Sequence, residues 1–354
     1  MPHHTKHPNR LRHLHTLTAL LCALLAQASP AAQRLCVFDL LGTSGDMFNA
    51  TKDYALAMQS AGATLTLKAY TDERIAVDDF RTGQCDALLA TAFRTRVFNP
   101  ITAATDSFGA ALILRHGKVD LAAGHEVVRL ASQAFTMPAA QSLVVQGAYE
   151  TAGIIDVGAV YGIVTDRKMN TPESMAGKRI LAFDYDKAQA YLIQKAGAQP
   201  VSADVTNFST KFNNGMADMT AAPALAFKPL ELYKGMGKSG AISRFPYLIM
   251  SYQLITRHQQ FPANFGDASR RYWLSHFDDM LGVIQKAENA IPASAWMDLS
   301  PENTPLYAQF LRETRIELAE QGLYNKRGLK MLKRIRCKLN AADPECVSPS
   351  EVNW

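Results

Sequence analysis

Two glycine-containing strings carry the residue types of known catalytic loops. Residues 42–46, GTSGD, resemble the nucleophile elbow of hydrolases, but that pattern needs glycine where Asp46 stands. Residues 235–240, GMGKSG, contain the Gly-Lys-Ser of a phosphate-binding loop, but that loop needs glycine at position 232, where the chain has Leu232. Neither string therefore predicts a catalytic or nucleotide-binding site.

Histidines and cysteines are poorly spaced for metal chemistry. Beyond the first 32 residues, no histidines show a paired metal-ligand spacing and no two cysteines lie two residues apart. The histidines concerned are His116, His125, His258 and His276. No nucleophile can be matched with a base either, so we expect no enzymatic activity, no metal and no cofactor.

Residues that follow predicted strands are better candidates for binding a ligand. In open α/β sheets, ligands bind beyond the carboxyl ends of the strands. The candidates in such places are Thr91, Arg94, Phe183, Asp184, Tyr185 and Met219. Each could instead be a solvated loop residue, and Arg94 could belong to a structural ion pair.

A tight turn after the first predicted strand supplies three more candidates. Thr43 or Ser44 can cap the helix that follows, and Asp46 lies at its start. The unpaired N–H groups and positive dipole end of such a helix can hold an oxygen atom of a ligand. A plain capping turn is the alternative interpretation.

The elements that must position these residues alternate regularly. Residues 171–223 read as strand (GKRILAF), helix (DKAQAYLIQKAG), strand (QPVSA), helix (about 207–214) and a short strand towards Pro223. The segment from Cys36 to Thr91 follows the same plan. Each half is therefore predicted to be β-α-β-α-β, which requires a parallel sheet with right-handed crossovers.

The first 32 residues have the order of a secretory signal. Three cations (Lys6, Arg10 and Arg12) precede an apolar run, LTALLCALLAQA, and then small residues. We expect cleavage near residue 32 and export to the periplasm. Loss of this segment lowers the net charge from +5 to +2, which gives no reason to expect nucleic acid as a partner.

Four cysteines remain after the signal, an even number that favours disulfides in an exported protein. Cys337 and Cys346 would close a small loop, and Cys36 and Cys85 open two predicted strands. If those strands are adjacent and parallel, their first residues are neighbours. The sequence therefore predicts the bonds Cys36–Cys85 and Cys337–Cys346.

A cationic stretch, KRGLKMLKRIRCKL, covers residues 326–339 near the end of the chain. It could contact an acidic partner or a membrane surface, or it could be a solvated helix face held by Cys337.

Several segments resemble the periplasmic solute-binding proteins of tripartite ATP-independent (TRAP) transporters, over about residues 37–290. The similar strings are FRTGQCD at 80–86, FNP at 98–100, TPESMAG at 171–177, AGAQPV at 196–201 and NGMAD at 214–218. The resemblance implies an α/β, two-lobe periplasmic-binding-protein fold of type II-like topology, with crossing strands and a long helix, 265–290, packed over both lobes. It also implies closure of the lobes on a small molecule.

The resemblance also implies a domain plan. Lobe 1 would contain residues 34–150 and 241–275, and lobe 2 would contain residues 151–240 and 276–336. Residues 337–354 would form a disulfide-closed tail.

The chain departs from that family where an arginine usually grips a substrate carboxylate. Leu181 stands at that position, and Tyr161 stands at a second basic position on the preceding strand. Asp184, Tyr185 and Asp186 instead offer acids and an aromatic ring, which could hold a cation or an amine. Capture of a simple organic acid in the usual way is therefore not expected.

The function predicted from these features is that of a monomeric periplasmic solute-binding protein. It would capture a small-molecule solute and present it to membrane transporter subunits. An accessory or sensory interaction protein with the same fold, for example one associated with efflux, is the alternative. A hydrolase is a distant third, because no nucleophile set can be assembled.

Overall fold

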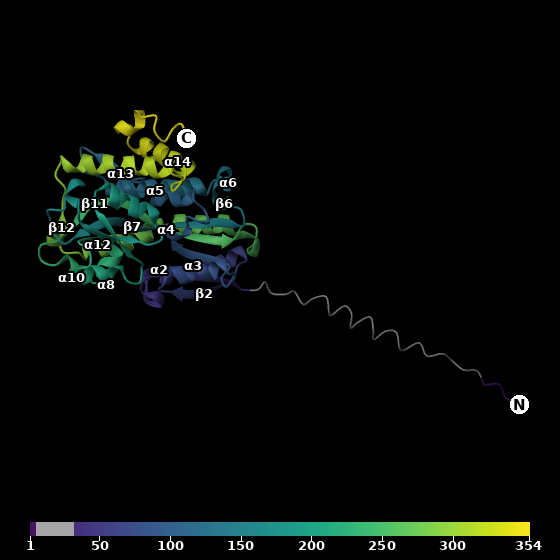
Figure 1. Cartoon of the computed structure of the whole chain (residues 1–354). Helices are drawn as coiled ribbons and strands as arrows, with labels where there is room; N and C mark the ends of the chain where they lie inside the picture. Colours follow the sequence, from purple (N-terminus) through teal and green to yellow (C-terminus); the bar gives the residue numbers. More distant parts are fainter. Residues whose placement is uncertain (5–31) are drawn as a thin grey trace. The chain divides into compact units, whose positions relative to one another are not determined.

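The computed structural model describes residues 1–4 and 32–354, and residues 33–354 form one compact unit. The predicted signal segment, residues 1–32, lies almost entirely outside the described residues. No helix in the described part of the chain is long and apolar enough to cross a bilayer. Residues 33–354 form a central sheet with helices on both faces (Figure 1), which is the predicted α/β architecture.

Three parallel strands form one end of the sheet. β1 (Gln33–Phe38) lies between β2 (Leu65–Tyr70) and β3 (Ala87–Thr91). The helices between them are α2 (Asp46–Ala57) and α3 (Glu73–Arg81). β3 is buried along its whole length, as expected for an apolar strand with neighbours on both edges and helices on its faces.

The other end of the sheet repeats this plan. β8 (Arg179–Phe183) lies between β9 (Gln199–Ala203) and β10 (Met219–Pro223), and all three run parallel. The helices between them are α7 (Lys187–Lys195) and α8 (Phe208–Asn213). The first strand of each half is thus the central one, and the predicted β-α-β-α-β order is confirmed in both.

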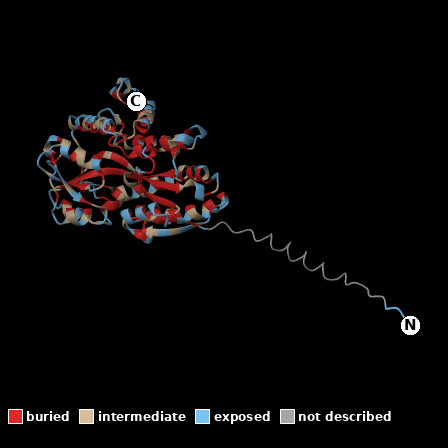
Figure 2. Ribbon diagram, turned by 45° about the vertical axis from the view of Figure 1, so that its right-hand side comes forward, coloured by how far each residue is buried: buried red, intermediate tan, exposed pale blue. Residues whose placement is uncertain are grey.

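Two long antiparallel strands join these halves. β7 (Tyr149–Val164) pairs with β11 (Ala241–Arg257) along most of its length. β11 also pairs with β3, and the end of β7 pairs with β10. The described residues thus form a ten-stranded sheet with the central path β2-β1-β3-β11-β7-β10-β8-β9. Figure 2 shows buried residues concentrated along this sheet, so the predicted crossing strands run through the core.

The predicted long helix is two helices in the structure. α11 (Phe265–Ser275) and α12 (Phe277–Asn289) meet at His276, whose backbone (φ −102°, ψ 16°) is outside the helical range. Asp278 and Asp279 lie in the first turn of α12, where the helix dipole stabilises acids. Both helices pack on β7. A Cβ atom at Gly153 of that strand would come within 2.5 Å of the Trp273 ring, so the small residue permits this close approach.

One face of the sheet is covered by α5 (Leu121–Phe135), α13 (Asn303–Glu320) and α14 (Lys326–Leu339). The other face is covered by α8 and α10 (Tyr233–Met236) (Figure 1). The shorter helices are α4 (Ala92–Thr95), α6 (Gln141–Val144) and α9 (Ala224–Phe227). The short strands are β4 (Leu114–Arg115), β5 (Lys118–Val119), β6 (Val145–Gln146) and β12 (Trp296–Met297).

Both predicted disulfides are present. Cys36 and Cys85 have Cα atoms 5.9 Å apart, because β1 and β3 are adjacent and parallel as predicted. The strands do not open at these residues, however: Cys36 is the fourth residue of β1, and Cys85 lies two residues before β3 begins. Cys337 and Cys346, with Cα atoms 5.6 Å apart, tie the tail to the end of α14.

The cationic stretch of residues 326–339 is not simply a solvated helix face. Arg336 is 2% exposed and pairs with Glu345 and Glu351 of the tail. The Lys333 ammonium donates to the carbonyl oxygens of Ser348 and Ser350. These cations hold the tail against the helix, so they are not available to an acidic partner.

Candidate ligand-binding cleft

The candidate site lies where two neighbouring strands separate. β8 and β10 share one registered pair, Ile180 with Met219. Beyond it, Leu181–Phe183 pair only with β9, and Thr220–Pro223 pair with β7. The two strands therefore diverge towards their carboxyl ends, and a cavity of about 140 Å³ opens between them.

Residues from both halves of the molecule line this cavity. β8 and β10 contribute residues near their carboxyl ends, and so do β1 and β3 from the other half. The crossing strands, α7 and α13 complete the wall. The residues after the four strands include Leu40 after β1, Phe93 after β3 and Tyr185 after β8. This is the place where open α/β sheets bind ligands.

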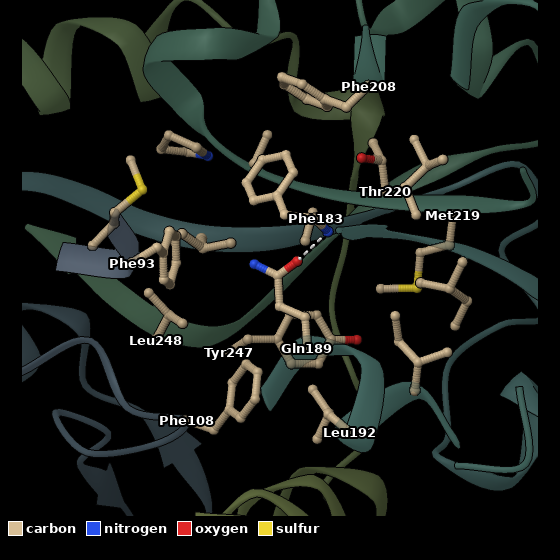
Figure 3. A pocket seen from close by; sticks show the side chains of 18 of the residues that line it. Phe93, Phe108, Phe183, Gln189, Leu192, Phe208, Met219, Thr220, Tyr247 and Leu248 are labelled. Carbon is tan, nitrogen blue, oxygen red and sulfur yellow. Dashed lines mark hydrogen bonds between the residues drawn. The ribbon is translucent and has the colours of Figure 1, made fainter. Parts of the chain in front are cut away.

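The cavity wall is mainly apolar and aromatic. Aromatic rings surround the space, among them those of Phe93, Phe108, Phe183, Phe208 and Tyr247 (Figure 3). Among the described residues that line the cavity, Glu73 is the only acidic or basic one. Further polarity comes from Gln189 and from threonine and tyrosine hydroxyl groups.

Gln189 presents a hydrogen-bond donor to the cavity. Its Oε1 accepts a bond of 2.9 Å from the backbone N–H of Phe183. Because that backbone group can only donate, the oxygen of the amide must face it and the Nε2 group must face the other way. Figure 3 shows Nε2 directed into the space between the rings, and within the described residues it has no hydrogen-bond partner.

Glu73 lies in a polar cluster at one side of the cavity. It is 1% exposed, and its Oε1 accepts from the backbone N–H of Thr91 at 2.7 Å and from the hydroxyl at 2.6 Å. Arg94 Nε lies 3.9 Å from Oε2, and the Tyr185 hydroxyl lies 3.5 Å from the same oxygen. Burial raises the pKa of Glu73 to about 7, although the bonds from Thr91 and the charge of Arg94 lower it.

Arg94 and Tyr185 connect the two halves of the molecule at this cluster. The guanidinium carbon of Arg94 lies 3.3 Å from the centre of the Tyr185 ring, a cation–π contact. Arg94 belongs to α4, directly after β3, whereas Tyr185 follows β8. The contact therefore spans the cleft.

The structure brings four of the predicted ligand-contact residues to the cavity wall and places one beside it. Those on the wall are Thr91, Phe183, Tyr185 and Met219. Arg94 does not line the cavity, but it contacts Tyr185 and Glu73, which do.

The turn at residues 42–46 is placed elsewhere. Thr43, Ser44 and Asp46 are exposed and do not line the cavity. The carboxylate of Asp39 accepts the backbone N–H groups of Leu41 and Phe48. The amino end of α2 therefore already has an anion from its own chain, and this part of the structure supports the capping interpretation.

Three other candidates also lie outside the cavity wall. Asp184 is exposed, and the carboxylate of Asp186 caps α7 by accepting the N–H groups of Ala188 and Gln189. Tyr161 donates to Glu288 Oε1 at 2.6 Å and packs edge-on against Trp296, in a separate groove. The acids proposed to hold a cation are thus not in the cavity, whereas Leu181, which the resemblance is expected to place at the position of an arginine, is on its wall.

Sequence reasoning missed several residues of the wall. Glu73 and Gln189 lie inside helical segments, where a polar residue gives no sign of facing a cleft. Phe108 and Tyr247 come from an irregular segment and from the middle of a crossing strand. No feature that these four residues share in the sequence marks them as part of the wall.

A family model described as "Solute-binding protein AdeT 1/2" matches residues 55–351. The chain is 43% identical over 316 residues to the probable solute-binding protein AdeT1 of Acinetobacter baumannii, covering 89% of this chain and 100% of that protein. It is 26% identical over 219 residues to the probable solute-binding protein AdeT2 of the same organism, covering 62% of this chain and 92% of that protein.

Solved structures show a similar fold. A TRAP periplasmic solute-binding protein from Desulfovibrio salexigens, with bound orotic acid, aligns with a TM-score of 0.66 at 12% identity, covering 87% of this chain and 99% of that one. One from Rhodoferax ferrireducens, with bound malonate, aligns with a TM-score of 0.63 at 15% identity, covering 86% and 98%. The chain therefore has the fold of TRAP periplasmic solute-binding proteins and belongs to the AdeT 1/2 family of solute-binding proteins.

Proposed function

We propose that this protein binds a small molecule in the cavity between β8 and β10 and presents it to membrane transporter subunits. The cavity at the carboxyl ends of strands from both halves of the molecule carries this proposal. The similar solved structures that hold orotic acid and malonate support it, because they share the two-lobe fold.

The proposed lobes are those expected from the sequence, residues 34–150 with 241–275 and residues 151–240 with 276–336. β7 and β11 pass between them, so a small change in these strands would open and close the cleft. The proposal includes export to the periplasm with cleavage near residue 32, a monomeric state and no catalytic step.

Native mass spectrometry tests this proposal directly. The full chain is exported to a bacterial periplasm, purified gently and weighed before and after denaturation. We expect a small molecule that leaves on denaturation, and amino-terminal sequencing should begin near residue 33.

A pair of variants locates the ligand. Ala221 lines the cavity, so Ala221→Phe should abolish retention of the molecule. Ala148 is exposed and does not line the cavity, so Ala148→Phe should retain it. No retained molecule, together with no thermal shift against a broad panel of acids, amino acids, sugars, amines and aromatic compounds, would contradict the binding role.

A further inference from the structure

The cavity offers an anion no positive partner. Among the described lining residues there is neither lysine nor arginine. Arg94, beside the cavity, already faces Glu73 and the Tyr185 ring. A carboxylate placed here would lose its hydration without gaining an ion pair, which is strongly unfavourable.

A cation is disfavoured for a different reason. Glu73 is the one acid on the wall, but Thr91 donates twice to its Oε1, while Arg94 and Tyr185 occupy the side of its Oε2. A cationic ligand would have to approach Glu73 next to the positive charge of Arg94. The tyrosines add no charge, since burial raises the pKa of Tyr185 and Tyr252 well above 10.

The size and the rings of the cavity favour a small aromatic compound. An engineered apolar cavity of about 150 Å³ is known to bind benzene, and the cavity here is of similar volume, about 140 Å³. Rings of Phe93, Phe108, Phe183 and Phe208 surround the space, where they can stack on a ligand ring or meet it edge-on (Figure 3).

The orientation of Gln189 favours a ligand that carries a hydrogen-bond acceptor. With Oε1 bonded to the Phe183 N–H, Nε2 is left as a donor that faces the cavity. Leaving such a group unpaired in an apolar site is unfavourable, so a ligand that offers an oxygen acceptor gains affinity.

From these four observations, and resting on the solute-binding role proposed above, we propose that the ligand is a small uncharged molecule with an aromatic ring and one hydrogen-bond acceptor. The ring fills the space between the phenylalanines, and the acceptor bonds to Gln189 Nε2. Leu181 is one of the apolar wall residues that leave a carboxylate without an ion pair.

Three ring compounds of similar shape and different charge test this class. Benzamide is neutral at pH 7, benzoate is an anion and benzylamine is a cation. Titration calorimetry and thermal shift on the wild-type full chain should show benzamide binding at least 10-fold more tightly than the other two. This comparison needs no variant, so it does not depend on any substitution folding well.

Two substitutions test the named residues. Gln189→Leu should weaken benzamide binding by about 2- to 12-fold, the range for one net hydrogen bond, and should leave the binding of toluene, which has no acceptor, unchanged. Gln194 is exposed on the same helix, so Gln194→Leu should change neither. Leu181→Arg should reverse the preference, with benzoate then binding more tightly than benzamide.

The outcomes separate this inference from the solute-binding role. Benzoate or benzylamine binding the wild type as tightly as benzamide would overturn the ligand class and leave the binding role intact. The same holds if no ring compound binds but the exported protein releases a molecule of another class. If no ring compound binds and no molecule is released, both proposals fail.

Discussion

At the scale of single residues, two buried acids should make the stability of this protein depend on pH. Glu73 at the cavity and Asp106, which is 0% exposed, both have a pKa raised to about 7, with burial as the main cause. Asp106 accepts bonds from the Ser251 backbone and hydroxyl at 2.8 and 2.6 Å, but these do not offset its loss of hydration. In both cases the folded protein holds a proton that the unfolded chain releases at lower pH.

The sign of the Glu73 contribution follows from this shift. Its stabilisation is complete below the unfolded pKa of 4.5 and is lost as the pH rises towards 7. Glu73→Gln keeps an oxygen for the two Thr91 donors but cannot ionise. The free energy of unfolding of the variant relative to wild type should therefore rise between pH 4.5 and 7, by at most about 3 kcal/mol.

Urea unfolding at several pH values between 4.5 and 7.5 measures this difference. Glu313→Gln, at an exposed position, serves as the control and should follow the wild-type curve. Parallel curves for Glu73→Gln and wild type would show that Glu73 ionises as easily in the folded protein as in the unfolded chain.

At the scale of the elements, buried ion pairs hold the tail that follows α14 against α13 and α14. Arg315 of α13 and Arg336 of α14 are each 2% exposed, and both pair with Glu345 and Glu351. Their remaining donors reach the carbonyl oxygens of Phe108 and Ala110. Burial opposes ionisation of Glu345, but the two arginines lower its pKa to about 2. The tail thus completes a cluster that would otherwise hold two unpaired cations.

Removing one acid from this cluster should be costly. Glu351→Gln leaves Arg315 and Arg336 buried with half of their carboxylate partners, and we expect a loss of about 3–5 kcal/mol in the free energy of unfolding. Glu320→Gln breaks an exposed pair with Lys326, which water screens, and should have a much smaller effect. Equal effects of the two substitutions in guanidinium unfolding would contradict the role given to the buried cluster.

At the scale of the whole molecule, we expect the Arg94–Tyr185 contact to favour a closed cleft. It joins the proposed lobes on one side of the cavity, and the crossing strands join them through the sheet. Because a cation–π contact contributes about 0.5–2 kcal/mol, its loss should shift the balance towards an open form without unfolding either lobe.

Arg94→Met tests this coupling. We expect a larger radius of gyration in solution scattering for the unliganded variant and a ligand affinity about 2- to 30-fold weaker, which corresponds to the energy of the lost contact. Arg115→Met changes an exposed arginine that pairs with Asp120 and should alter neither quantity. An unchanged radius and affinity for Arg94→Met would mean that the cleft closes without this contact.

The sequence by itself determined the order of the elements. Hydrophobic periodicity is local, so the strand at Gln199–Ala203 and the helix at Phe208–Asn213 could be predicted closely from short stretches of chain. The sequence predicted the Cys36–Cys85 bond on the condition that their two strands are adjacent and parallel, and the structure confirms that β1 and β3 are.

Only the tertiary structure decided which side chains share the cavity. Tyr185 faces it while its neighbour Asp184 is exposed, a difference of one residue in a loop that no periodicity controls. Glu73 of α3 and Gln189 of α7 reach the cavity from helices in different halves of the molecule. Fold follows from local patterns that repeat along the chain, whereas the chemistry of this site depends on contacts between residues far apart in sequence.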